Sequence, residues 1–390
     1  MRNPSTLSRR AWLKSVGAGS LLLLGGHGLG GCNSYYPSEA GVAFAPWNYP
    51  PEGESRPEWL AAAAAILAAS PHNTQPWLFA IRASRIDLYV AQERNLGTMD
   101  GLRRELHIGL GCAMENLVLA AAQHGRSATV RLLPDPSDET HVAAIDLTPA
   151  APTESALYDA MARRHTNRSQ YLESDPPPGL EQAVRTVCTE PGVHLTWLAS
   201  VPSKQRFAEA TLAATQAIVD DDQMNADSDA WYRHTAAEIE QFRDGPTLDA
   251  TGLPTAQRNL AKLLARPDAR TAGEYWIEST RARQLSGFAF VVLSTPHSAG
   301  REAQLSVGRA YQRTHLWATA NGLAMQPLNQ LAERADREEI LGLPSVARAA
   351  IAELLGDHRG DRAQMLFRIG VPWEDGLRSP RRPLDWAVRS

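Results

Sequence analysis

Residues 57–78 read PEWLAAAAAILAASPHNTQPWL, and residues 177–198 read PPGLEQAVRTVCTEPGVHLTWL. At a constant offset of 120 residues the two stretches align without a gap and share six identical residues, including Trp77 with Trp197. A repeat at a fixed spacing is typical of a duplicated architecture. We therefore interpret the chain as two related units, with chance similarity between alanine-rich segments as the alternative.

A second pair of segments follows in the same order. Residues 108–125 (IGLGCAMENLVLAAAQHG) match residues 305–322 (LSVGRAYQRTHLWATANG), and each segment ends on a glycine, Gly125 or Gly322. An apolar periodic run closed by glycine is typical of a helix. The offset grows from 120 to 197 residues between the two pairs, so we expect the second unit to carry an insertion, at 200–275.

Short strand patterns alternate with longer helical patterns along the chain. The expected strands cover residues 77–81, 86–90, 129–133, 142–147, 288–294 and 365–371. We therefore predict an α+β fold: two fused units around long central helices, each with a small mixed or antiparallel sheet. The predicted boundaries are 32–54 for a linker, 55–147 for unit 1, 148–156 for a second linker, 157–375 for unit 2 with the insertion 200–275 as a candidate lid, and 376–390 for a C-terminal tail.

Residues 1–31 resemble a twin-arginine export signal. Arg9 and Arg10 are followed by Ala-Trp-Leu-Lys and an apolar run at 16–24, and Leu-Gly-Gly precedes Cys32 as in a lipoprotein cleavage box. The apolar run is shorter than the roughly 20 residues that a membrane span needs. We predict an exported protein, periplasmic or anchored to a membrane through a lipid on Cys32, with an ordinary basic N-terminus as the alternative.

The composition is that of a folded globular protein, with 43% hydrophobic and 21% charged residues among 390. The net charge of -4 offers no basic excess that could hold a nucleic acid, so we expect no such partner. The three cysteines show no C-x-x-C spacing and predict neither a disulfide scaffold nor a zinc motif. Cys112 and Cys188 lie in apolar helical patterns, and their pairing stays open. The acidic run at 220–222 is interpreted as a solvated helix end rather than a metal site.

Residues 70–77, SPHNTQPW, form a polar loop between a predicted helix and a predicted strand. Its Asn, Thr and Gln side chains offer paired donors and acceptors suited to a flat heterocycle with alternating C=O and N–H groups, while two prolines stiffen the loop. The aligned residues 190–197 of the second unit read EPGVHLTW and lack most of the amide groups. The alternative is a purely structural turn.

Residues 163–169, RRHTNRS, bring three arginines and two hydroxyl groups together. Arginine side chains bind phosphate oxygens in a bidentate manner, so this segment is a candidate phosphate clamp. At the same offset the first unit has residues 43–49, AFAPWNY, with no basic side chain. A solvated face with surface ion pairs is the alternative.

The two polar segments are therefore complementary. One unit keeps a loop suited to a polar ring and the other keeps a clamp suited to a phosphate, so a fused pseudo-dimer would form one complete site at the junction of its units. A ligand with a flat polar ring and a terminal phosphate is FMN-like.

At this point the motifs resemble a known family. SPHNTQPW at 70–77 and RRHTNR at 163–168 are similar to flavin-binding signatures of the nitroreductase superfamily, and GLAMQPLNQ at 322–330 and QMLFRIG at 364–370 resemble its Acg branch, in which two units are fused. The resemblance covers roughly residues 55–375. It implies a nitroreductase-like fold and one FMN per chain.

The resemblance also implies a set of FMN-binding residues and no metal. Those for the phosphate are Arg164, Thr166 and Arg168, assisted by Arg368; those for the ribityl chain and ring edge are Ser70, His72, Asn73 and Gln75; those for the other side of the ring are Gln326 and Pro327. No side chain is assigned a catalytic role, because the flavin carries the reactivity.

These observations predict an FMN-dependent oxidoreductase that reduces nitro or quinone-like acceptors by ping-pong hydride or electron transfer, with NAD(P)H as a candidate donor. The absence of a Gly-x-Gly-x-x-Gly fingerprint agrees with a nicotinamide that docks only transiently. The principal alternative is an exported flavin-binding or sequestering protein with little turnover, whose insertion covers the flavin. A lipid-anchored scaffold without a cofactor is the third.

Overall fold

The computed structural model describes residues 36–389. The predicted export signal and Cys32 lie outside the described residues. Among the described residues, no helix combines the length and the apolar character needed to cross a membrane.

The first unit is built on a four-stranded sheet with the order β1-β2-β4-β3, in which every neighbouring pair is antiparallel. Its helices and strands are α2 (Pro57–Ala65), β1 (Trp77–Arg82), β2 (Arg85–Val90), α3 (Arg104–Gln123), β3 (Arg126–Leu132) and β4 (His141–Pro149). The apolar residues of the strands alternate with polar ones where one face meets solvent, as in β3.

The second unit repeats this arrangement with the order β5-β6-β8-β7, again antiparallel throughout. Its elements are α4 (Ala156–Asp159), α5 (Leu180–Val187), β5 (His194–Leu198), β6 (Ala289–Pro296), α11 (Arg301–Ala320), β7 (Ala324–Pro327), α12 (Gln330–Leu341), α13 (Val346–Leu355) and β8 (Asp361–Gly370). Both sheets also shift register at the equivalent pair, between β2 and β4 and between β6 and β8. The predicted α+β class, with two units around central helices, is confirmed.

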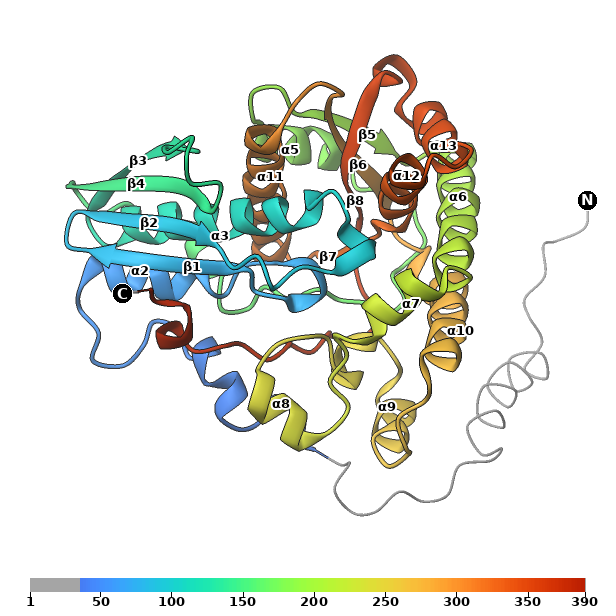
Figure 1. Ribbon diagram of the computed structural model, residues 1–390, viewed down its shortest axis with the longest axis horizontal. Helices are drawn as coiled ribbons and strands as arrows, with labels where there is room; N and C mark the ends of the chain where they lie inside the picture. The colour runs from blue at the N-terminus through green and yellow to red at the C-terminus, as the bar shows by residue number, and fades with distance from the viewer. Residues whose placement is uncertain (1–35, 390) are drawn as a thin grey trace, which may run out of the picture.

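The central helices α3 and α11 pack against each other between the two sheets (Figure 1). A Cβ on Gly111 would lie 2.1 Å from the carbonyl oxygen of Leu305, and a Cβ on Gly308 would lie 2.1 Å from that of Ile108. The sequence repeat pairs Gly111 with Gly308 and Ile108 with Leu305, so the contact is the same from either side, as across a twofold axis. Only glycine allows the two backbones to approach this closely.

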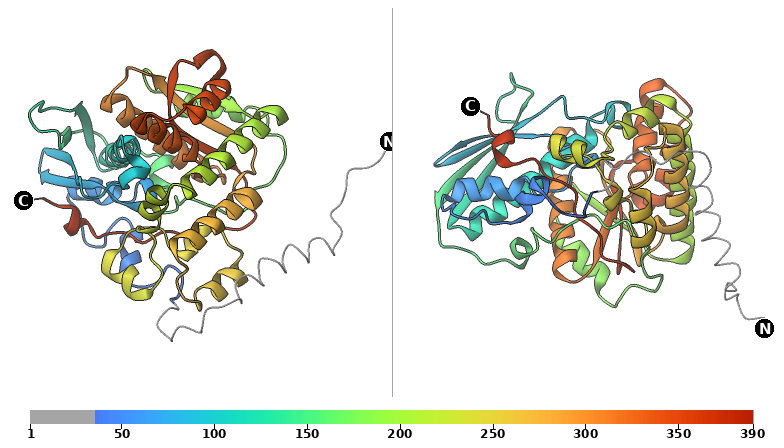
Figure 2. Two further views of the ribbon diagram at one scale, coloured as in Figure 1. Left: turned by 45° about the vertical axis from the view of Figure 1, so that its right-hand side comes forward. Right: turned by 90° about the horizontal axis from the view of Figure 1, so that it is seen from below.

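Five helices lie between β5 and β6 of the second sheet. They are α6 (Val201–Val219), α7 (Asp222–Asp229), α8 (Ala236–Phe242), α9 (Thr255–Ala261) and α10 (Ala269–Ser279). Figure 2 shows α6 and α10 packed against each other on the outside of the molecule. Asp221, in the acidic run, accepts a hydrogen bond from the Met224 amide at the start of α7 and pairs with Arg337, so this run caps a helix.

The C-terminal segment leaves the second sheet and returns to the first unit (Figure 1). Its last residues lie beside β1, where Val388 bridges Phe79 and the Arg389 amide donates to the Phe79 carbonyl at 2.8 Å. On the way, this segment crosses the junction between the units. The two units therefore share one continuous apolar core and are tied together by the end of the chain.

Candidate functional site

A cavity of about 1230 Å³ lies where the first unit, the second unit and the inserted helices meet. Its volume exceeds the roughly 300–1,000 Å³ of an ordinary small-molecule site. It is lined by eight of the ten residues expected to bind a cofactor: Ser70, His72, Asn73, Arg164, Thr166, Arg168, Gln326 and Pro327. Segments far apart in the sequence are thus brought to one site.

The loop at 70–77 holds an unusual backbone conformation. His72, Asn73 and Gln75 have φ angles of 41°, 55° and 53°, in the left-handed region that residues other than glycine rarely adopt. Each such residue costs on the order of 1–3 kcal/mol, and such conformations cluster at binding sites because the surrounding structure must impose them. Here Pro71 begins the 3-10 turn η2 (Pro71–Asn73), and the Ser70 hydroxyl accepts the Gln75 amide at 3.0 Å.

The loop contains a buried hydrogen-bond acceptor without a partner among the described residues, the side-chain oxygen of Asn73. Its side-chain amide donates to the carbonyl oxygens of Pro380, at 2.8 Å, and Gly245, at 3.2 Å. Its side-chain oxygen is buried and has no hydrogen-bond partner within residues 36–389. A buried polar atom without a partner costs free energy, so this oxygen is suited to accept a hydrogen bond from a ligand N–H or O–H.

His72 is held neutral in the cavity wall. Burial, with the nearby Arg168 cation, lowers the pKa of His72 to about 4. Its Nε2 lies 3.0 Å from the Ser228 hydroxyl of α7, which connects the loop to the inserted helices. At neutral pH the ring therefore acts as a hydrogen-bonding group without charge.

Arg164 and Arg381 form a pair of buried cations without a carboxylate. Both point a guanidinium nitrogen at the Leu67 carbonyl oxygen, at 3.2 Å and 3.5 Å, and both line the cavity. They are 2% and 3% exposed, and neither takes part in an ion pair with any described residue. Burial lowers the pKa of Arg164; burial, reinforced by Arg164, lowers that of Arg381 well below its ordinary value.

Several donors of this pair are unused. The Nε atom of Arg164 and the Nε and Nη1 atoms of Arg381 are buried and have no hydrogen-bond partner in the part of the chain that the structure describes. Arg381 also lies over the Trp47 ring, 4.8 Å from its centroid, which fixes the guanidinium plane. Two adjacent cations with free donors are suited to a dianionic group such as phosphate.

Arg168 completes the basic side of the cavity from the same segment as Arg164. Its Nη1 atom donates to the Ala250 carbonyl oxygen at 3.0 Å, and a Cβ on Gly252 would lie 2.1 Å from the Arg168 carbonyl oxygen. The insertion therefore packs directly on the predicted clamp. Thr166, which lies between Arg164 and Arg168 in the sequence, also lines the cavity.

Gln75 and Arg368 are brought to the same region, but neither lines the cavity. The Gln75 amide is used by backbone groups of Arg243, Asn73 and Arg382. Arg368 donates to the carbonyl oxygens of Arg283, Ser286 and Ser169 and stacks on Tyr171 at 3.7 Å. These hydrogen bonds give both side chains a structural role, although the Nε atom of Arg368 is buried without a partner among the described residues. Their predicted contact with the cofactor stays a prediction.

Gln326 and Pro327 of β7 lie at another part of the wall. The Gln326 amide nitrogen donates to the Gln284 side-chain oxygen at 2.9 Å, and the Gln326 side-chain oxygen is buried without a partner in the described residues. Like Asn73, it offers an acceptor to a ligand. The cavity is therefore basic at one region and presents neutral amide oxygens elsewhere.

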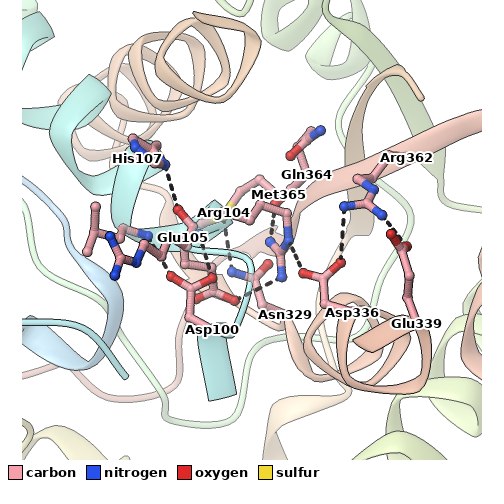
Figure 3. Close-up of polar contacts among 12 residues, drawn as sticks. Asp100, Arg104, Glu105, His107, Asn329, Asp336, Glu339, Arg362, Gln364 and Met365 are labelled. Atoms are coloured by element: carbon pink, nitrogen blue, oxygen red, sulfur yellow. Dashed lines mark hydrogen bonds and ion pairs between the residues drawn. The ribbon is translucent and has the colours of Figure 1, made fainter. Parts of the chain in front are cut away.

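A group of buried acids lies beside the cavity at the start of α3 (Figure 3). Arg104 donates to Asp336 at 2.8 Å and to Glu105 at 3.2 Å, and Asp100 accepts the backbone amides of Glu105 and Leu106. Burial, with Glu105, raises the pKa of Asp100 to about 7. Arg104 is the fully buried cation of this group, and Asp336 also lies 3.7 Å from the partly buried Arg362.

Glu333 of α12 belongs to this group and lines the cavity together with Glu105. Burial, then the Glu105 carboxylate, raises the pKa of Glu333 well above its ordinary value. The Glu333 carboxyl group therefore keeps its proton to a higher pH than an exposed glutamate does. One wall of the cavity thus holds an exchangeable proton at a site the sequence did not indicate.

Comparison with known proteins finds similarity over most of the chain. No family model matches it. The chain is similar to proteins named as nitroreductases. It is 28% identical over 331 residues to "Putative NAD(P)H nitroreductase Rv3131" of Mycobacterium tuberculosis, covering 83% of this chain and 88% of that protein. It is 26% identical over 332 residues to "Putative NAD(P)H nitroreductase acg" of the same species, covering 82% and 92%.

Solved structures give weaker likenesses. The FMN-dependent nitroreductase NfnB from Mycobacterium smegmatis in complex with NADPH aligns with a TM-score of 0.37 and 18% identity, over 60% of this chain and 97% of that one. A putative nitroreductase from Anabaena variabilis aligns with a TM-score of 0.40 and 9% identity, over 87% and 93%.

Arg381 is the main cavity residue that sequence reasoning missed. It lies in the segment 376–390, which the sequence marks only as a tail. The signal that could have found it is the pair Arg381-Arg382 between two prolines, a basic group held in a stiff segment. Its burial depends on the return of the tail across the junction and is visible only in three dimensions.

Proposed function

We propose that the protein is an FMN-dependent oxidoreductase of the nitroreductase type, with one FMN per chain in the cavity between its units. The proposed reaction is the two-electron reduction of nitro or quinone-like acceptors by NAD(P)H. The observation that carries the proposal is the Arg164–Arg381 pair, two buried cations with free donors and no carboxylate. The similarity to mycobacterial proteins named as NAD(P)H nitroreductases supports the same conclusion.

The residues of the basic region fit a phosphate. A guanidinium buried without an anion costs several kcal/mol, so a site with two of them is incomplete without a negatively charged ligand. Arg164 and Arg381 would hold the FMN phosphate, with Thr166 and Arg168 beside them. Their fixed planes favour a bidentate contact over a loose ionic one.

The neutral part of the cavity fits a polar ring. The free side-chain oxygens of Asn73 and Gln326 are suited to accept from ring or ribityl donors, and Ser70 and neutral His72 add hydrogen-bonding groups without charge. When bound, the flavin would accept a hydride from one substrate and pass it on to another, which gives ping-pong kinetics. The chain's own contribution is to bind and orient it and to exclude water.

A second candidate, a flavin-binding or sequestering protein with little turnover, has one observation in its favour. The inserted segment supplies a large part of the cavity wall, including Tyr232, Trp276 and Ser228. It is also fastened to the ring-side loop by the His72–Ser228 and Asn73–Gly245 contacts. A wall attached in this way could restrict access of a dinucleotide to the cavity.

The experiment uses the full chain, purified with added FMN. We expect one FMN per chain by absorbance, and rapid bleaching on anaerobic addition of NADPH or NADH. Tightly held FMN that neither nucleotide bleaches would support the sequestering protein, and a colourless chain that FMN does not stabilise would reject both.

The assigned clamp is tested by Arg164→Ala, which should release the flavin, with Arg206→Ala on the exposed side of α6 as the matched control. Circular dichroism establishes that each variant is folded. Full retention of FMN by a folded Arg164→Ala protein would contradict the assignment.

We also propose that the chain is exported and carries a lipid on Cys32. The support is the order of residues 8–14 and the Leu-Gly-Gly before Cys32. The mass of the mature N-terminus, in a host with twin-arginine export, tests this directly. An unmodified Cys32 would contradict the lipid.

A further inference from the structure

Two histidines and an aspartate meet at one end of the second sheet, away from the cavity. His194 begins β5, Asp361 begins β8, and His358 ends the 3-10 turn η6 (Gly356–His358) just before β8. The Nδ1 atom of His194 lies 2.7 Å from Asp361 Oδ2, and that of His358 lies 4.0 Å from the same oxygen. None of the three residues lines the cavity.

The three side chains are close enough to share one ion. One ligand atom from each lies within 4.8 Å of those of the other two. The two imidazole rings are stacked, with centroids 4.2 Å apart. A tetrahedral zinc ion with bonds of about 2.0–2.1 Å needs ligand atoms about 3.3 Å apart. The side chain of His358 is 42% exposed, so it has room to move closer to the other two ligands and reach this spacing.

The backbone around the cluster is rigid. His194 is paired with Ser294 in the sheet, and Asp361 is paired with Pro296 on the other side of the same strand, β6. The Ser294 hydroxyl donates to Asp361 Oδ2 at 2.9 Å. A hydrogen bond of this kind orients a carboxylate ligand from outside the coordination sphere.

No arginine or lysine neutralises Asp361 among the described ion pairs, where its partners are the two histidines. The first sheet offers a contrast. In that sheet His141 lies 3.1 Å from the Asp87 carboxylate. The same carboxylate also pairs with Arg82 at 2.6 Å and with Arg85 at 2.7 Å. Asp87 is therefore already compensated by two cations, whereas Asp361 keeps its charge available for a metal.

We propose that His194, His358 and Asp361 form a binding site for one divalent transition-metal ion, with zinc as the probe. Two imidazoles and one carboxylate are ligands that zinc accepts, and a water would occupy the fourth position. The site would tie β5, η6 and β8 together at the end of the second sheet. It is independent of the proposed flavin function.

The test uses the full chain without a polyhistidine tag, stripped with a chelator and then titrated with Zn²⁺ in competition with a chromophoric chelator. We expect one zinc ion per chain and an upward shift of the melting midpoint on adding zinc. His358→Ala changes a partly exposed side chain and should lower the zinc affinity at least tenfold, as should Asp361→Asn.

His141→Ala, in the arginine-neutralised contact of the first sheet, is the matched control and should bind zinc as the unaltered protein does. Circular dichroism of the stripped variants separates loss of the site from loss of the fold. The proposal is overturned if the unaltered chain does not compete for zinc, or if a folded His358→Ala protein keeps the full affinity.

Discussion

Two buried arginines of this protein, Arg104 and Arg381, have opposite surroundings. Burial alone would lower the pKa of Arg104, but Asp336, Glu105 and Asp100 raise it above its ordinary value. Arg381 is equally enclosed, has Arg164 as its charged neighbour, and has its pKa lowered well below the ordinary value. Arg104 is therefore neutralised by carboxylates of the fold, whereas Arg381 has no anionic partner among the described residues.

The largest loss of stability is expected on replacing Arg104, the buried arginine that is paired with carboxylates. Arg104→Met leaves Glu105 without its cation and Asp336 with only the more distant Arg362. Removing one partner of a buried pair costs about 3–5 kcal/mol of unfolding free energy. Urea denaturation at pH 7 measures this loss. Arg206→Ala, at the surface of α6, should change stability little. A loss of less than about 1 kcal/mol of unfolding free energy for Arg104→Met would show that the fold does not depend on its ion pairs, against our interpretation.

At the Arg164–Arg381 pair, the change in the free energy of unfolding should be small or of the opposite sign. Arg381→Met removes a buried cation that has no carboxylate, so the flavin-free chain should be unchanged in stability or gain up to roughly 4 kcal/mol. The same variant should lose the stabilisation that FMN gives the unaltered protein. Melting midpoints with and without FMN measure both effects. A flavin-free Arg381→Met protein much less stable than the unaltered chain would show that the arginine serves the fold.

The arginine pair should make the cavity selective for a ligand that carries a phosphate. Riboflavin has the ring and ribityl chain of FMN without the phosphate, so FMN should bind more tightly by roughly 10- to 100-fold, which corresponds to about 1.5–3 kcal/mol for hydrogen bonds to charged groups. Fluorescence titration of both ligands measures the ratio. In Arg381→Met the ratio should fall toward one. An equal affinity for both ligands in the unaltered protein would place the phosphate away from the arginines.

The smallest effect concerns the acids near Arg104. The folded chain keeps a proton on Glu333 that the unfolded chain releases near the ordinary pKa of 4.5, so this group makes stability fall as pH rises above that value. Glu333→Gln carries no such proton. Its stability relative to the unaltered protein should therefore improve from pH 5 to pH 8, as measured by urea midpoints. Glu353→Gln, on the exposed side of α13, is the control. A stability difference between Glu333→Gln and the unaltered protein that does not change with pH would contradict the raised pKa of Glu333.

The repeat in the sequence predicted much of the fold. The matched pairs correspond to equivalent elements, and Gly111 and Gly308 meet each other at the centre of the molecule. All six expected strands exist, with boundaries moved by a few residues. The short strands β5 and β7 were not expected. The sequence of β5, HLTWL, alternates over only five residues, and that of β7, AMQP, has four residues and ends on proline. Pairing with β6 and β8 stabilises both strands.

The candidate site was predicted in part, for a physical reason. Residue type and spacing indicate which side chains could bind a ring or a phosphate, and eight of the ten expected residues line one cavity. Residue type and spacing do not indicate which polar side chains form their hydrogen bonds within the protein instead of with a ligand. Arg368 fits a phosphate clamp by type, but nearby carbonyl oxygens accept hydrogen bonds from both of its Nη atoms, and only its Nε is left without a partner among the described residues.

Local order and composition are enough to predict the duplication, the α+β class and the division of a polar loop and an arginine segment between two units. Three further contacts appear only in the folded chain: Arg381 returns from the end of the chain to the Leu67 carbonyl oxygen that Arg164 also contacts, Glu333 meets Glu105, and His194, His358 and Asp361 share one end of the second sheet. Such contacts join residues that are distant in the sequence. Their electrostatic energies depend on burial and separation, which emerge only when the chain is folded.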